Sequence, residues 1–235
     1  MRVLVVTAVP VERDAVTRAF GDGPPRPHFV RGAEIHRAGG FDVLAGGAGP
    51  AAAAASAAFA LAAAPVPYRL VVSAGIGGGF APAAPVGSLV VASGIVAADL
   101  GAETAEGFVP VTGLGFGRDR YLPPRSLVRE VVSATGAVSG KVLTVSTVTG
   151  SAARAAALLT AHPSAVAEAM EGFGVAEAAE RFGVPVLELR AVSNAVGPRD
   201  RAAWRIGEAL SVLTEAFGKI APVLEGWTRH DRHLD

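Results

Sequence analysis

The stretch Leu70–Phe80, LVVSAGIGGGF, decides the fold class of this 235-residue chain. Its first half is a short run of mostly apolar and β-branched residues, which is typical of a strand buried on both faces. Its second half is a glycine cluster, which predicts a tight turn and lets the backbone approach a ligand closely. A buried strand that ends in such a turn is typical of an α/β protein built on a central sheet.

Similar apolar runs recur on both sides of this stretch and alternate with helical patterns. Such alternation predicts a mainly parallel or mixed sheet with helices on both faces. Two further short runs joined through Gly39-Gly40 predict an antiparallel hairpin, Ile35–Ala38 with Phe41–Leu44. The predicted strands are Val3–Ala8, Val43–Gly46, Leu70–Ala74, Ser88–Val96, Lys141–Ser146 and Val186–Val192. The predicted helices are Val11–Phe20, Pro50–Ala64, Arg125–Ala134, Ala152–Thr160, Gly172–Phe182 and Arg201–Leu224.

The segments between these elements indicate one domain. No polar linker or internal repeat divides the chain, so residues 1–235 are expected to form a single three-layer α/β domain. Ala102–Tyr121 is rich in glycine and has no periodic pattern, which predicts a long loop with a role in function or at an interface. Gly226–Asp235 is polar, and we expect it to be a frayed tail.

The composition favours small-molecule partners. Hydrophobic residues make up 51% of the chain, enough for one sizeable core. Lysine and arginine total 21, as do aspartate and glutamate, so the balance gives no electrostatic footprint for nucleic acid or an anionic membrane. The alanine-rich stretch Ala48–Pro67 predicts a packed helix and no membrane span. We therefore expect no nucleic-acid or membrane partner. The absence of cysteine fits a reducing compartment, and we expect a cytoplasmic protein.

Cysteine and histidine usage restricts the chemistry. The chain has no cysteine, which excludes disulfides, thiolate nucleophiles and cysteine-ligated zinc. Its five histidines show no metal-ligand spacing, so no metal site is predicted.

Polar side chains lie at three predicted strand ends. Glu12 follows the first strand, Glu171 lies at a strand-to-helix junction, and Asn194 ends the last strand. Alone, each has a structural explanation: a carboxylate favoured by a helix dipole, or an amide in a cap or turn. Together they should meet at one rim of the sheet. Cleavage of a glycosidic bond needs this set: a base for water, a carboxylate for sugar hydroxyls, and a polar group for the leaving base.

The glycine cluster matches neither common phosphate-binding pattern. Phe80 occupies the position of the third glycine of the dinucleotide fingerprint, and no Lys-Ser/Thr pair follows as in a P-loop. A dinucleotide-binding module therefore remains only a weak alternative.

Four stretches carry a resemblance that runs over most of the chain. They are VTAVPVE at 6–12, SAGIGGGF at 73–80 with VGSLVV at 86–91, VAEAMEG at 166–172, and VLELRAVSN at 186–194. In these motifs the chain resembles the nucleoside phosphorylase and nucleosidase superfamily, in particular its methylthioadenosine/S-adenosylhomocysteine nucleosidase branch. The resemblance implies a nucleoside phosphorylase-like fold, with a mixed sheet that is partly barrel-like. It also implies a purine nucleoside substrate and no cofactor.

The same resemblance implies a role for each matching residue. Glu12 would be the general base that deprotonates water, and Asn194 would face N7 of the purine. Met170 would pack against the ribose, whose hydroxyls Glu171 would bind. The other substrate-contacting positions would be Ala8, Gly75, Ile76, Thr147 and Val148.

Two departures from the related sequences refine the expected reaction. Adenine-specific nucleosidases carry aspartate where this chain has Asn194, and an amide can donate to a 6-keto oxygen while it accepts from a protonated N7. This favours a 6-oxopurine, although a flipped amide would tolerate adenine. Ile76 stands where relatives have a hydroxyl residue, and Ser73 stands near the position of the phosphorylase arginine. Water is therefore favoured over phosphate as the nucleophile.

The Ser-Asn pair and the GIGGGF segment resemble the futalosine-hydrolysing nucleosidases of an alternative menaquinone pathway. Their substrate implies release of hypoxanthine and a cation for the carboxylate on the C5′ extension. Arg118 and Arg120 are the main candidates, with Arg199 and Arg201 as further ones.

Three alternatives stay open: a methylthioadenosine-type nucleosidase, a purine nucleoside phosphorylase, and a non-catalytic nucleoside-binding protein. The resemblance further implies a homo-oligomer, a dimer or larger, in which Ala102–Tyr121 could reach a neighbour's site.

Overall fold

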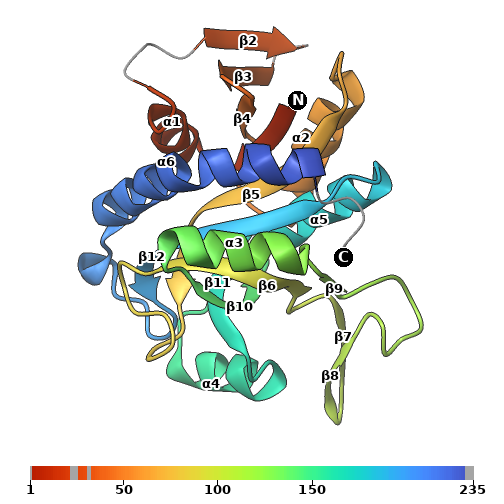
Figure 1. Cartoon of the computed structure of the whole chain (residues 1–235). Helices are drawn as coiled ribbons and strands as arrows, with labels where there is room; N and C mark the ends of the chain where they lie inside the picture. Colours follow the sequence, from red (N-terminus) through yellow and green to blue (C-terminus); the bar gives the residue numbers. More distant parts are fainter. Residues whose placement is uncertain (1, 22–25, 31–32, 231–235) are drawn as a thin grey trace.

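The computed structural model describes residues 2–21, 26–30 and 33–230, and it has the predicted three-layer α/β architecture (Figure 1). A ten-stranded sheet has the order β11-β10-β6-β12-β5-β1-β4-β3-β2, and β9 pairs with β6. An additional pairing of β11 with β5 closes part of this sheet into a barrel. The strands are β1 (Arg2–Thr7), β2 (Arg26–Val30), β3 (Ala33–Ala38), β4 (Phe41–Ala45), β5 (Tyr68–Gly79), β6 (Leu89–Ala97), β9 (Arg120–Tyr121), β10 (Val138–Thr144), β11 (Ala165–Ala169) and β12 (Val186–Ala195).

The sheet is mixed, as predicted. β1 runs parallel to β4 and β5, and β10 runs parallel to β6 and β11. β12 is parallel to β5 and antiparallel to β6. The predicted hairpin is confirmed as β3 and β4, and β2 extends it by an edge strand that the sequence pattern did not predict.

Helices cover both faces of this sheet. In Figure 1, α3 and α6 lie across the near face, and α1 lies beside the end of α6. Buried side chains form one core on that side, and a second core lies under α2 and α5. The alanine-rich stretch forms α2, as predicted. The helices are α1 (Pro10–Arg18), α2 (Pro50–Ala63), α3 (Arg125–Thr135), α4 (Ala152–Ala161), α5 (Gly172–Arg181) and α6 (Ile206–His230).

The glycine cluster forms strand, so the predicted turn after Ala74 is wrong. β5 continues to Gly79 because its glycines leave room for the backbone of adjacent segments. A Cβ at Gly77 would lie 2.8 Å from the carbonyl oxygen of Glu168 on β11, and one at Gly79 would overlap the carbonyl of Ala84. The glycines therefore permit the crowded pairing that closes the barrel.

The predicted loop Ala102–Tyr121 contains regular structure. β7 (Gly101–Thr104) and β8 (Gly107–Pro110) form an antiparallel hairpin that projects from the body (Figure 1), and β9 follows. The strands are short and largely exposed, so no apolar alternation marks them in the sequence.

Both ends of the last predicted helix need correction. A separate 3₁₀ turn, η1 (Arg201–Ala203), precedes α6, which begins at Ile206. α6 continues through the predicted frayed tail to His230, because the buried Trp227 ring donates its Nε1–H to Ser126 Oγ (3.0 Å) on α3. The rest of the predicted tail lies outside the described residues. No helix in the described part of the chain is long and apolar enough to cross a membrane.

Candidate active site

The three polar strand ends meet at one cavity, as predicted. Its volume is about 180 Å³, and it lies at the carboxyl ends of β1, β11 and β12. Among the predicted residues it brings together Glu12, Glu171 and Asn194, and it adds a tryptophan. The lining residues are Ala8, Glu12, Ile76, Gly77, Gly78, Val148, Glu168, Ala169, Met170, Glu171, Ser193, Asn194 and Trp204.

Glu12 is held rigidly in this cavity by backbone donors. Pro10 begins α1, and the Glu12 side chain folds back over the first turn. Its Oε2 accepts from the N–H groups of Ala8 (2.9 Å) and Val9 (3.2 Å), and its Oε1 accepts from that of Ile76 (2.8 Å). Burial raises the pKa of Glu12, and the Ile76 N–H and the charge of Arg190 oppose that rise.

Glu171 links three segments at the strand-to-helix junction. It is the N-cap residue of α5, and its Oε1 accepts from the N–H of Gly49 (3.2 Å), just before α2. Its Oε2 accepts from the N–H of Met170 (3.3 Å) and pairs with Arg190 Nη1 (3.2 Å). The carboxylate is buried and fixed, which suits a ligand for vicinal hydroxyls.

Arg190 is a fully buried residue that pairs with Glu171 and Glu188, and the sequence prediction missed it. Its Nη2 donates to Ser73 Oγ (2.9 Å), and its Nε donates to Glu188 Oε1 (2.9 Å). A Cβ at Gly75 would lie 2.6 Å from Glu12 Oε1 and 2.9 Å from Arg190 Nη1, so only glycine leaves room for both groups. Gly75 therefore makes room for Glu12 and Arg190 and does not line the cavity.

Asn194 lies at the carboxyl end of β12, after a register shift against β5. Its Oδ1 accepts from Ser193 Oγ (2.9 Å), and its Nδ2 donates to the carbonyl of Ala195 (3.1 Å). One amide hydrogen and one lone pair stay available for a ligand.

Glu168 and Trp204 also line the cavity, although the sequence prediction named neither. Glu168 accepts from the N–H (2.8 Å) and the Oγ1–H of Thr149, and so fixes the segment that carries Val148. Thr147 belongs to that segment but is not among the lining residues. Trp204 lies before Arg205, whose N–H donates to the carbonyl of Ser193 (2.8 Å).

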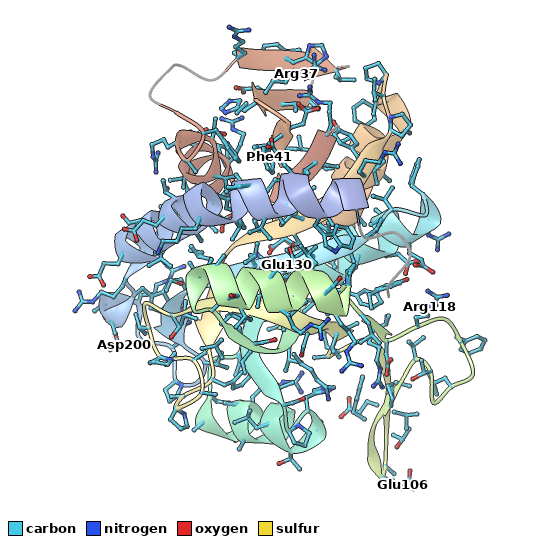
Figure 2. All side chains as sticks on the ribbon, viewed as in Figure 1. Arg37, Phe41, Glu106, Arg118, Glu130 and Asp200 are labelled. Atoms are coloured by element: carbon cyan, nitrogen blue, oxygen red, sulfur yellow. The ribbon has the colours of Figure 1, made fainter. Side chains whose placement is uncertain are left out.

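Arg118 and Arg120 lie outside this cavity. They line a second one, of about 620 Å³, where Arg118 pairs with Glu180 on α5 and Arg120 pairs with Asp119. Figure 2 places Arg118 and Asp200 at opposite sides of the molecule. Beside Asp200, the guanidinium carbons of Arg199 and Arg201 lie 5.1 and 5.9 Å from the Trp204 ring centroid.

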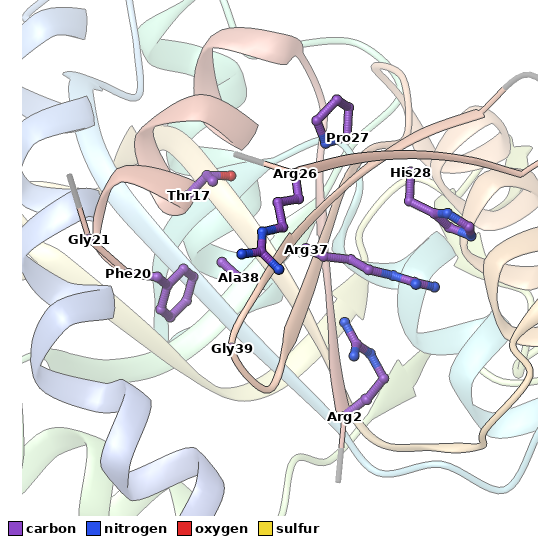
Figure 3. A pocket seen from close by; sticks show the side chains of 10 residues that line it. All are labelled: Arg2, Thr17, Phe20, Gly21, Arg26, Pro27, His28, Arg37, Ala38 and Gly39. Carbon is purple, nitrogen blue, oxygen red and sulfur yellow. The ribbon is translucent and has the colours of Figure 1, made fainter. Parts of the chain in front are cut away.

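A larger cavity, of about 720 Å³, lies near the amino ends of β1 and β4 (Figure 3). Arg2 and Arg37 converge there on the buried Asp42, which also accepts from Tyr68 Oη (2.8 Å). None of the predicted site residues lines it. Within the described residues, no group of three His, Asp or Glu side chains is placed to hold a metal ion.

Comparison with known families and sequences yields consistent matches. Residues 2–225 match the model of the phosphorylase superfamily. The futalosine hydrolase of Streptomyces coelicolor is 68% identical over 99% of this chain and 100% of its own length. That of Acidothermus cellulolyticus is 45% identical over 92% of this chain and 89% of its own length.

Solved structures match the fold at low sequence identity. The native futalosine hydrolase of Helicobacter pylori has a TM-score of 0.81 and 18% identity, over 95% of this chain and 98% of its own. The methylthioadenosine/S-adenosylhomocysteine nucleosidase of Colwellia psychrerythraea, solved with adenine, has a TM-score of 0.73 and 21% identity, over 93% and 97%. Both likenesses confirm the nucleoside phosphorylase-like fold.

Proposed function

Since the chain belongs to the phosphorylase superfamily, we propose that it hydrolyses the N-glycosidic bond of futalosine and releases hypoxanthine. The observation that carries the proposal is the convergence of Glu12, Glu171 and Asn194 on one cavity. The 68% identity to a futalosine hydrolase along the whole chain supports the choice of substrate.

Glu12 delivers the water. Three backbone N–H groups fill most of the acceptor sites of its carboxylate and leave one for a water molecule beside the ribose. The carboxylate takes a proton from that water as the C1′–N9 bond breaks and the C1′–O bond forms. Because burial raises the pKa of Glu12, activity should be lost below a pH that lies above the usual range of a glutamate.

Glu171 and the cavity walls stabilise the ribosyl group. The Glu171 carboxylate accepts from ribose hydroxyls, while Met170 packs against the sugar. The bond to the purine weakens before the new bond forms, so positive charge develops on the ribose. Two fixed carboxylates beside that charge stabilise it, because they are already in place and need no reorganisation.

Asn194 binds the leaving hypoxanthine. As the C1′–N9 bond breaks, N7 takes a proton from solvent water. The free lone pair of Asn194 Oδ1 accepts from this N7–H, and the free amide hydrogen reaches the 6-keto oxygen. The Ser193 hydroxyl fixes the amide orientation by donating to Oδ1. The amide thus holds the base and donates no catalytic proton.

The surroundings of Glu12 favour water over phosphate. The Ile76 N–H, which could otherwise donate a hydrogen bond to a bound anion, already donates to Glu12. The Ser73 hydroxyl accepts from Arg190. A phosphate ion would also meet the Glu12 and Glu171 carboxylates, which repel it. These contacts argue against the phosphorylase alternative.

A comparison of nucleosides tests the proposal. We expect release of hypoxanthine from futalosine at equal rates with and without phosphate, and little adenine from methylthioadenosine. A rate that depends on phosphate would favour a phosphorylase. Preferred adenine release would favour the methylthioadenosine alternative, and no turnover of any nucleoside would favour the binding protein.

We expect a homodimer or larger assembly, in which Arg118 and Arg120 on the segment after the β7–β8 hairpin reach a neighbouring copy. Light scattering measures the mass of the assembly, and a monomer would contradict it. Cell fractionation tests the expected cytoplasmic location.

Arg199 and Arg201 are the alternative ligands for the substrate carboxylate, because they lie over Trp204 at the cavity.

A further inference from the structure

Glu188 is a buried carboxylate that the proposed reaction does not use. It lies on β12 opposite Ser73 of β5, and its exposed fraction is 0%. Its Oε1 accepts from Arg190 Nε (2.9 Å), whereas its Oε2 has no hydrogen-bond partner among the described residues. It does not line the active-site cavity. A carboxylate without a full set of donors is costly to bury, so its position calls for an explanation.

The surroundings of Glu188 connect it to the active site through one residue. Arg190 contacts Glu188 with Nε and Glu171 with Nη1 (3.2 Å), and its charge also acts on Glu12. The first turn of α5 packs closely against the other side of Glu188, since a Cβ at Gly172 would overlap both oxygens of the Glu188 carboxylate. Glu188 therefore has little room to move and fixes Arg190 from behind.

The charges in this cluster do not balance. Within the described residues it holds three carboxylates, Glu12, Glu171 and Glu188, and one guanidinium, Arg190. The other polar group that faces the cluster, the Ser73 hydroxyl, is neutral. Excess negative charge away from water favours retention of a proton.

Glu188 differs from the other two carboxylates in its hydrogen bonds. Glu12 accepts three backbone N–H groups and Glu171 accepts two, and such donors favour the ionised form. Glu188 accepts none from the backbone within the described part of the chain. Burial raises the pKa of Glu188 to about 7, and the charge of Glu171 adds to the rise while Arg190 opposes it.

We propose that Glu188 is a protonated positioning residue that holds Arg190 in place and leaves its charge to Glu171 and Glu12. The inference rests on the proposed function, because it concerns the alignment of the same base and the same ribose ligand. When Glu188 loses its proton, it competes with Glu171 for Arg190. The Glu171 carboxylate is then held less firmly and binds the ribose hydroxyls less tightly. The residue thereby limits activity at high pH without contact with the substrate.

Two substitutions at Glu188 separate charge from position. Glu188→Gln reproduces the protonated acid, and its amide oxygen still accepts from Arg190 Nε. We expect its kcat and KM for futalosine to match the wild type at pH below Glu188's pKa of about 7. Glu188→Leu removes the acceptor and frees Arg190, so KM should rise by about tenfold or more, or about 1.4 kcal/mol of binding free energy.

The pH profile gives the sharpest readout. The kcat/KM of the wild type should fall as pH rises above about 7, whereas that of Glu188→Gln should stay level to higher pH. Asp42→Asn is the matched control. Asp42 is also buried and paired with arginine, but it lies near the amino end of β4, away from the cavity. That control should lower thermal stability and leave the kinetic profile unchanged.

Identical wild-type and Glu188→Gln profiles would overturn the inference, as would an unchanged KM in a folded Glu188→Leu. Titration of ¹³C-labelled glutamate carboxyls, with Glu188 assigned by the Gln variant, gives a readout without turnover. A Glu188 carboxyl that titrates in the usual glutamate range would contradict the inference even if the wild type hydrolysed no nucleoside. Absence of futalosine turnover in the wild type, by contrast, would contradict only the proposed function.

Discussion

Asn194 is the residue on which the choice of purine depends. Replacement by aspartate removes the N–H that we assign to the 6-keto oxygen and supplies an acceptor for a 6-amino group. Asn194→Asp should therefore shift the ratio of hypoxanthine to adenine release by about tenfold or more towards adenine. Initial rates with futalosine and methylthioadenosine measure the ratio. An unchanged ratio would show that other contacts select the base.

Glu188 gives the folded protein a pH-dependent stability. The unfolded chain releases the Glu188 proton near the ordinary value of 4.5, whereas the folded protein keeps it up to about 7. The folded state thus binds more protons in that window, so stability falls as pH rises through it. Glu188→Gln should gain stability relative to the wild type from pH 4.5 to about 7 and hold the gain above.

Denaturant unfolding of both proteins across this range measures the difference. A difference that stays constant with pH would mean that Glu188 is ionised throughout.

At the residue scale, polar groups at strand ends were predictable from sequence, and polar groups in the interior of a strand were not. Glu12, Glu171 and Asn194 end or follow apolar runs, which marks each of them as a group at a strand end. β1 and β12 both run parallel to β5, so the rule that parallel strands bring their carboxyl ends together accounts for Glu12 and Asn194. Glu171 follows β11, which runs antiparallel to β5, and its place depends on the closure of the barrel. Glu188 and Arg190 lie inside such a run, where only the structure shows which partners they have. Their one sequence signal is a pair of opposite charges two residues apart, on the same face of a buried strand.

At the scale of elements, the segment between β12 and α6 covers one side of the cavity. It carries Trp204, and the Arg205 N–H ties it to the end of β12. Hypoxanthine in the cavity should change the fluorescence of Trp204. The chain has two tryptophans, and the other, Trp227, is buried between α6 and α3.

A titration of intrinsic fluorescence with hypoxanthine measures this response. Trp227→Phe should keep the response and Trp204→Phe should lose it. A response that persists in Trp204→Phe would place the base elsewhere.

Elements with strong apolar patterns were the predictable ones. β1, β12 and α2 lie close to the predicted ranges because apolar runs and alanine-rich stretches mark them. The glycines of β5 suggested a turn because glycine is ordinarily unfavourable in strands, and here close packing against β11 overrides that preference. The β7–β8 hairpin escaped prediction because it buries little.

At the scale of the molecule, the residue pattern predicts the three-layer order, whereas the partial closure into a barrel was expected only from the family resemblance and is confirmed. Closure depends on the pairing of β11 with the end of β5, a contact between segments far apart in the chain. That closure brings Glu168 and Glu171 into the cavity that β1 and β12 already border. The active site is thus a consequence of the topology, which local patterns alone do not specify.

Hypoxanthine release from futalosine without phosphate, by the wild type and by Glu12→Gln, tests the account most directly. The variant keeps the size of the side chain and removes the base. We predict that the wild type turns over and that kcat of the variant falls by about 10²–10⁴-fold with KM little changed. Thermal stability should fall, because the new amide NH2 faces a backbone N–H that donated to the carboxylate. Equal turnover by both proteins, or wild-type turnover only with phosphate, would contradict a hydrolase that depends on Glu12.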